Sequence, residues 1–221
     1  MARALSLFIF TLGLSLPASA KPIRFEVRDP AQRDLIQVTS DIPLEKMVAI
    51  SSAVGGWFEI DPDKLSDVVK GELQSDVRNF DSGNSSRNDF LRDKVWMAPE
   101  GPGIVFVPQK MLHVSKARLG EGQPVAFRVE GLLKYRGLSK VISVLGKMTY
   151  QKQSEATAAH RGPGNLIRVS ANFDLDLTQF GFSTPEIGKA RLSRYLQVST
   201  DFVASDTQWV TAVPVVNPPE K

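Results

Sequence analysis

Hydrophobic and polar side chains alternate with a period of two in several stretches of the chain. The clearest is LIRVSANFDLDL at residues 166–177, where every odd position is apolar and every even position from 168 to 176 is polar. Successive side chains of a strand point to opposite faces, so this pattern predicts a strand with one buried and one hydrated face. A helix would mix Asp174 and Asp176 with the apolar side chains, whereas the strand places both on the hydrated face.

The same alternation recurs along the chain, between turns that contain glycine. Further strands are predicted at 23–28, 69–78, 125–130 and 196–203. Turns are predicted at 55–56, 101–103, 120–122 and 162–164. Residues 128–150 indicate two strands joined by a turn at Arg136-Gly137. Because strands do not alternate with long helices, we expect an all-β antiparallel domain and not a parallel α/β fold.

One stretch breaks the alternation and has the spacing of a helix. SSRNDFLRDKVW at residues 85–96 follows an Asp-Ser-Gly-Asn turn, and Ser85 or Ser86 can cap a helix there. The apolar side chains of Leu91 and Val95 stand four residues apart, on one face of that helix. The stretch therefore predicts a short helix with one apolar edge.

The buried faces of the predicted strands fit two architectures, a sandwich and a barrel. The positions expected inside mix small with aromatic residues: Gly71, Ser75, Ala171 and Thr200 with Phe25, Phe127, Phe173 and Phe202. Small residues inside a large sheet leave room for a ligand, but ordinary packing also mixes sizes. The residue pattern alone leaves both an open cavity and a filled interior as alternatives.

Residues 1–20 have the organisation of a secretory signal peptide. Arg3 supplies a positive start, a mostly apolar run follows, and small residues lead to a cleavage site after Ala20. The apolar run is short for a membrane span, so an uncleaved N-terminal anchor is the less favoured alternative. Residues 21–221 are expected to form a single domain, with a loose proline-rich tail from about residue 214 and no later membrane-spanning segment.

Charge and cysteine usage narrow the function further. The formal net charge is +3, from 27 lysines and arginines and 24 acidic residues that are interspersed along the chain. No basic stripe of the kind that follows a phosphate backbone is present, which argues against nucleic-acid binding. The sequence contains no cysteine, which excludes a thiol nucleophile, a thiolate metal site and a lipidated cysteine.

The sequence shows little that is typical of a catalytic or metal site. His113 and His160 are far apart and have no metal-ligand spacing, and no G-x-S-x-G motif occurs. Ser139 and Lys140 are neighbours on a predicted strand, so their side chains point in opposite directions. Asp174 and Asp176 are expected to be a solvated surface pair. The sequence predicts a protein without catalytic residues, metal or cofactor, and a hydrolase built around His113 or His160 is the least favoured alternative.

Three stretches, in order, resemble motifs of the YceI-like family. VEGLLKYRGLSK at 129–140 is similar to V-x-G-x-L-T-I-x-G-V-T-K. QSDVRNFDSG at 74–83, with the helix that follows it, resembles the family's strand, T-G turn and R-D-x-x-L helix start. FDLDLTQFGF at 173–182 is similar to its strand leading into D-F-G-I, although Leu177 stands in place of the usual arginine. The resemblance covers about residues 35–204.

The resemblance implies a lipocalin-like, eight-stranded antiparallel barrel with a short helix near one end. It also implies a periplasmic protein whose apolar cavity holds an isoprenoid, such as a quinone or polyprenyl lipid, or a fatty-acyl chain, for transport or storage. Candidate lining residues are Phe25, Leu73, Val77, Phe127, Val129, Val169, Phe173, Leu175, Val198 and Phe202, and Phe90, Leu91 and Trp96 are candidates for the cavity mouth. The alternative is a non-catalytic envelope interaction module with a filled barrel, and a homodimer is one option for its assembly.

Overall fold

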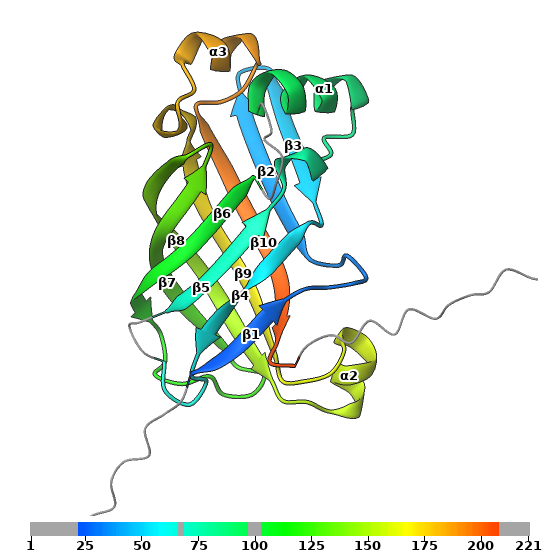
Figure 1. The fold of residues 1–221 in the computed structure, drawn as a ribbon, viewed down its shortest axis with the longest axis vertical. Helices are drawn as coiled ribbons and strands as arrows, with labels where there is room; N and C mark the ends of the chain where they lie inside the picture. Colours follow the sequence, from blue (N-terminus) through cyan, green and yellow to red (C-terminus); the bar gives the residue numbers. More distant parts are fainter. Residues whose placement is uncertain (1–21, 66–68, 97–102, 208–221) are drawn as a thin grey trace, which may run out of the picture.

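The computed structural model describes residues 22–65, 69–96 and 103–207, which form a closed antiparallel β-barrel with short helices at both ends (Figure 1). The ring consists, in spatial order, of β1 (Ile23–Val27), β4 (Val54–Ile60), β5 (Lys70–Ser75), β6 (Ile104–Val114), β7 (Pro124–Tyr135), β8 (Leu138–Gln151), β9 (Leu166–Asp176) and β10 (Tyr195–Ser205). Pairing of Val27 with Ala204 joins β1 to β10 and closes the ring. The predicted eight-stranded all-β barrel is therefore confirmed.

A further hairpin, β2 (Leu35–Ile42) and β3 (Glu45–Ser51), enlarges one end of the barrel. β10 pairs with β1 near its C-terminal end and with β2 over Leu196 to Asp201, so the two strands share one edge of β10. The 3-10 turn η1 (Val77–Asn79) and helix α1 (Ser85–Phe90) follow β5 and lie near the edge of β3. α1 and α3 (Thr184–Lys189) lie at this end, and α2 (Glu155–Arg161) lies at the other (Figure 1).

The barrel interior contains two buried clusters, one toward each end. The cluster toward α2 is named the filled half, and its members include Phe25, Val27, Phe58, Val125, Phe127, Val129, Met148, Ile167, Val169 and Phe202. The cluster toward α1 and α3 is named the pocket half, and its members include Met47, Val77, Leu91, Leu133, Tyr135, Leu177, Phe180, Phe182 and Leu196. The partly buried side chains of Phe106, Ile142 and Phe173 pack against both clusters and mark the boundary.

Aromatic rings lie directly against glycines of neighbouring strands around this boundary. A Cβ atom added to Gly131 of β7 would lie 2.6 Å from Cζ of Phe106, and one added to Gly146 of β8 would lie 2.6 Å from Cζ of Phe127. Any larger residue at these two positions would force the rings away from the wall. The two glycines therefore let the rings fill the cross-section of the barrel, since well-packed interiors leave few voids.

Loops close the filled half at its end, and α2 is attached beside it. The backbone N–H of Leu65 donates to the Ala117 carbonyl, and that of Leu119 donates to the Pro62 carbonyl, so two loops cross-link below the barrel. Arg161 of α2 contacts Asp29 and the buried carboxylate of Asp34. These contacts tie α2 to the segment between β1 and β2.

The hairpin and the helix predicted from sequence are both present. Arg136 and Gly137 have φ values of 51° and 75°, as a tight two-residue turn that matches strand twist requires. The helix spans α1 and then continues as the π-helical turn η2 (Leu91–Trp96), but its cap is Asn84 and not Ser85 or Ser86. The N-cap prediction was therefore one or two residues late.

Several local predictions need correction. The expected turn at 55–56 is wrong, because Gly55 and Gly56 lie inside β4. Val203 has the same parity as Gln197, Ser199 and Asp201, which predicts a hydrated position, but it is buried, and its backbone N–H donates to the carboxylate of Asp34. The polar stretch 151–164 contains α2, whose Ser154 forms a capping box with Thr157. The predicted signal peptide and the predicted tail from about 214 lie outside the described residues, as does most of the predicted turn at 101–103.

Candidate functional site: an apolar pocket in one half of the barrel

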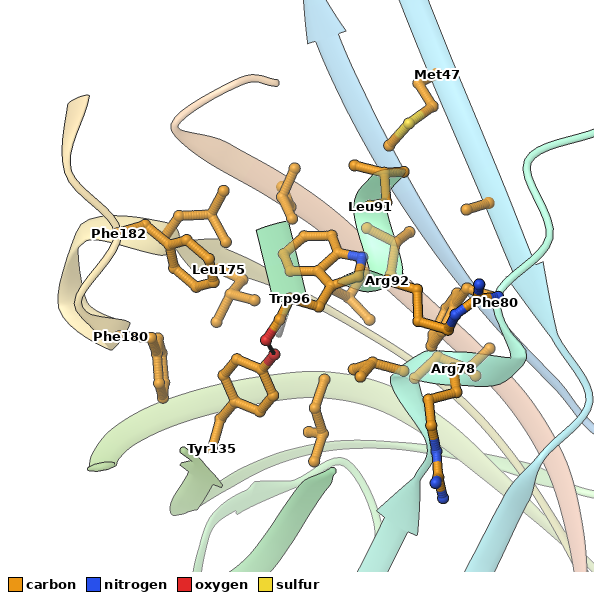
Figure 2. Close-up of a pocket in the computed structure, with 18 of the residues that line it drawn as sticks. Met47, Arg78, Phe80, Leu91, Arg92, Trp96, Tyr135, Leu175, Phe180 and Phe182 are labelled. Carbon is orange, nitrogen blue, oxygen red and sulfur yellow. Dashed lines mark hydrogen bonds between the residues drawn. The ribbon is translucent and has the colours of Figure 1, made fainter. Parts of the chain in front are cut away.

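The pocket half encloses a narrow apolar pocket (Figure 2). Of its 21 lining residues, all but Arg78, Asn88 and Arg92 have aliphatic or aromatic side chains. The cavity between them has a volume of only about 70 Å³. The pocket is therefore a slot between side chains, and a hydrocarbon chain would enter by displacing them.

Several different parts of the chain build the pocket wall. The inward faces of β9 and β10 supply Phe173, Leu175 and Val198, because their alternation turns every second side chain inward. The β2–β3 hairpin, the η1–α1–η2 segment, β6, β7 and the 3-10 turn η3 (Leu177–Phe180) with the following Phe182 supply the rest. Because these parts are far apart in sequence, the pocket exists only in the folded barrel.

Three aromatic side chains hold one side of the pocket together. The hydroxyl of Tyr135 on β7 donates a hydrogen bond of 2.6 Å to the carbonyl of Trp96 in η2. The ring of Phe182 stacks on Tyr135 at 6.4 Å between centroids and meets Trp96 edge-on at 5.7 Å. Burial raises the pKa of Tyr135 to about 12, so its hydroxyl remains protonated and can donate. Figure 2 shows the three side chains lying together.

The polar lining residues are held by neighbouring side chains. Arg78 donates to Asp76, and Arg92 forms ion pairs with Asp89 and Asp93. The amide of Asn88 donates to Asp81, and its oxygen accepts from the backbone N–H of Ser82. These contacts anchor α1 and η2 beside the pocket and balance the arginine charges locally.

The structure distributes the predicted lining residues over both halves of the interior. Those that line the pocket are Val77, Phe173, Leu175 and Val198. Those that belong to the filled half are Phe25, Phe127, Val129, Val169 and Phe202, and the partly buried Leu73 packs against it. Among the predicted mouth residues, Leu91 and Trp96 line the pocket, whereas Phe90 is 43% exposed and is not part of its lining. Contact of any of these residues with a ligand stays a prediction.

Several lining residues were missed from the sequence. Met47 and Ala49 share a face of β3, where the stretch EKMVAIS at 45–51 offered a short alternating signal. Tyr135 has the same inward direction as the predicted Val129 on β7. Phe180 and Phe182 follow the end of β9, where no periodicity predicts which way a side chain points.

The side chains considered for catalysis are not brought together at the pocket. His113 on β6 is exposed and borders a polar hollow on the outer wall, next to Arg128 and Lys147, and His160 is exposed on α2. Within residues 22–65, 69–96 and 103–207, no group of three or more histidine, aspartate or glutamate side chains is placed to hold a metal.

The aspartate pair predicted to be solvated needs correction. The side chain of Asp176 is only 13% exposed and accepts from Arg194 at 2.7 Å. It also caps η3 by accepting from the N–H of Thr178. The hydrogen bonds from Arg194 hold the pKa of Asp176 well below its usual range. Asp176 therefore fixes the junction between β9 and β10 beside the pocket.

Fold and pocket together define a lipocalin-like barrel, a closed antiparallel sheet with an apolar internal site. Residues 29–204 match the YceI-like domain, and the chain belongs to that family, as its sequence motifs predicted. No curated protein matches the chain in sequence. Among the described residues, no helix is both long enough and apolar enough to cross a membrane.

Two solved structures illustrate the shared fold. One is described as a polyisoprenoid binding domain from Saccharophagus degradans implicated in plant cell wall breakdown. It is 14% identical with a TM-score of 0.59, over 84% of this chain and 99% of that one. The other is a YceI protein of Campylobacter jejuni, 17% identical with a TM-score of 0.56, over 76% of this chain and 90% of that one. At these identities the likeness concerns the fold alone.

Proposed function

We propose that the protein is an exported, non-catalytic binding protein that holds one long apolar chain in the pocket half of its barrel, for transport or storage. The observation that carries the proposal is the pocket lining, in which apolar side chains from several parts of the chain face a common slot. Burying a hydrocarbon chain there would contribute about 0.8 kcal/mol per methylene, so enclosed length would set affinity.

An isoprenoid chain is our first choice of ligand, and a fatty-acyl chain is the second. The Saccharophagus degradans domain of the same fold is described as binding polyisoprenoid, which supports this order. Cleavage after Ala20 and a periplasmic location are part of the proposal and are supported by the composition of the first twenty residues. The homodimer stays a prediction, which sedimentation of the purified protein would check.

The filled-barrel alternative accounts for the half of the interior around Phe25 and Phe127. It does not account for a slot bounded by Phe173, Leu175 and Val198, which a solid core would close. We therefore place the lipid-holding function first and the envelope interaction module second.

The test is the lipid content of protein exported to a periplasm and purified without detergent. Organic-solvent extraction and mass spectrometry should find an isoprenoid or acyl species in stoichiometric amount. A protein that is empty and takes up no added isoprenol or fatty acid would contradict the proposal and favour the interaction module.

A further inference from the structure

The two ends of the barrel differ in charge. At the pocket end, residues 134–140 and 176–195 carry six lysines and arginines and two acidic residues. Residues 41–46 and 76–96 at the same end are nearly balanced, with five basic and six acidic residues. The opposite end is also nearly balanced, with seven basic and six acidic residues in the segments 28–34, 61–65, 115–123 and 152–161. The excess positive charge therefore lies on the β7–β8 turn and around α3.

These two basic segments are in contact and border the pocket. The guanidinium of Arg136 lies 5.6 Å from the ring centre of Phe182, which lines the pocket. The pKa of Glu186 on α3 is lowered, first by hydrogen bonds from Ser183 and then by the charges of Arg136 and Lys189. Lys189 and Arg191 are exposed and lie outside the pocket lining. A common cationic face results, next to the proposed ligand site.

Large apolar side chains are exposed at the same end. Leu44 is fully exposed at the tip of the β2–β3 turn, and Phe90, Leu138 and Tyr195 are also exposed. The turn is linked to α1 by the ion pair of Glu45 with Arg87 at 3.5 Å. Figure 1 shows this turn between α1 and α3. Leu44 has a φ of 72°, a backbone conformation that favours glycine or asparagine. The geometry of the turn therefore does not explain why leucine stands at this tip.

We propose that this end of the barrel docks on an anionic phospholipid bilayer. Lys189, Arg191 and Arg136 would face the acidic head groups, and Leu44 and Phe90 would enter the interface. The proposal rests on the proposed lipid-holding function, because a long-chain lipid is almost insoluble in water and has to pass between a membrane and the slot. The charge excess selects a bilayer with acidic lipids over a neutral one.

Vesicle co-sedimentation tests the docking surface. The purified protein is expected to bind vesicles of phosphatidylcholine with phosphatidylglycerol more tightly than vesicles of phosphatidylcholine alone, and salt should weaken this binding. Joint substitution of Lys189→Gln and Arg191→Gln should weaken it by about 30-fold at low salt, since each such charge near an anionic surface contributes about fivefold. Leu44→Ser should weaken it several-fold.

The matched control is Lys116→Gln with Arg118→Gln, which removes two exposed cations at the opposite end. This variant should bind vesicles as the unmodified protein does. Equal binding to both kinds of vesicle, or equal losses in the two double variants, would overturn the docking proposal. Mass spectrometry of bound lipid separates the two proposals. Protein that contains lipid but does not bind vesicles contradicts the docking proposal alone. Protein that contains no lipid and takes up none contradicts the proposed lipid-holding function.

Discussion

In the filled half of the barrel, the ring of Phe127 lies on Gly146 of the next strand, and the core is closed by loops below it. In the pocket half, Phe173, Leu175 and Val198 come from strands of the same alternation, yet they face a slot. Alternate side chains therefore point inward in both halves. The halves differ in how completely side chains from neighbouring strands fill the interior. Stability and ligand binding are expected to depend on different halves of one interior.

The largest expected effect is on the filled half. Phe25 is fully buried, and its ring stacks on Phe58 at 5.8 Å between centroids. Phe25→Ala should lower the free energy of unfolding by about 3–5 kcal/mol, because it leaves a cavity in a closed core. Urea unfolding measures this loss. Lipid binding per folded molecule should not change. A Phe25→Ala variant that keeps its stability but loses lipid would contradict the claim that stability and ligand binding depend on different halves.

The pH dependence of stability tests the role of the buried Asp34, which lies near the closed end of the filled half. Asp34 is 1% exposed, one of its oxygens has no hydrogen-bond partner among the described residues, and burial raises its pKa to about 6. Because folding disfavours the ionised form, stability should fall as pH rises from about 4 to about 6, by up to about 3 kcal/mol. The neighbouring Asp29 has its pKa lowered to about 2 by hydrogen bonds from Arg33, so its contribution to stability has the opposite sign and is gained mostly below about pH 4.

Asp34→Asn checks this assignment. The variant should be more stable than the unmodified protein above pH 6 and should lose the slope between pH 4 and 6, since the amide oxygen can still accept from the N–H of Val203. Chemical unfolding at several pH values gives both quantities. An unchanged slope would assign the titration to another group.

A matched pair of substitutions compares the halves directly. Phe173 touches both clusters and lines the pocket, whereas Phe202 lies in the filled half. Phe202→Ala should cost more stability, about 3–5 kcal/mol, because its site is more completely buried. Phe173→Ala should release lipid faster than its smaller loss of stability explains. Lipid retention after gel filtration and urea unfolding of both variants measure the two effects. Greater loss of lipid in the Phe202 variant than in the Phe173 variant would contradict the assignment of the ligand to the pocket half.

The smallest expected effect concerns the hydrogen bond between Tyr135 and Trp96 at one side of the pocket. Tyr135→Phe removes the hydroxyl that donates to the Trp96 carbonyl and should lower the free energy of unfolding by about 1 kcal/mol. Because this bond ties η2 to β7, the variant should also release lipid faster. Stopped-flow transfer of a fluorescent fatty acid to acceptor vesicles measures the release rate. An unchanged rate would show that η2 does not control access.

The family resemblance supplied the choice of a barrel over a sandwich, whereas alternation along the strands predicted only an antiparallel all-β domain and the inward direction of residues such as Phe25 and Val198. Alternation did not predict which half is open, because that depends on cross-strand contacts such as Phe106 with Gly131, which need the register of β6 and β7. The family resemblance, by contrast, correctly placed a helix at one end. Sequence alone could therefore not separate Phe25 and Phe202, which lie in the filled half, from Phe173, which lines the pocket.

The short helices show a different limit. α2 and α3 span seven and six residues, too short for a hydrophobic period to emerge. Only α3 carries a local signal, because Ser183 and Glu186 have the spacing of a capping box, which the structure forms. Phe180 and Phe182 near α3 enter the pocket through tertiary packing, which no local signal encodes.

The position of the bound chain tests the central claim most directly. Met47 lines the pocket, and Met148 is buried in the filled half, so their methyl groups report on the two halves. A fatty acid that carries a nitroxide near its methyl end should broaden the NMR methyl signal of Met47 strongly and leave that of Met148 much sharper. Equal broadening, or stronger broadening of Met148, would place the chain in the filled half and contradict the account.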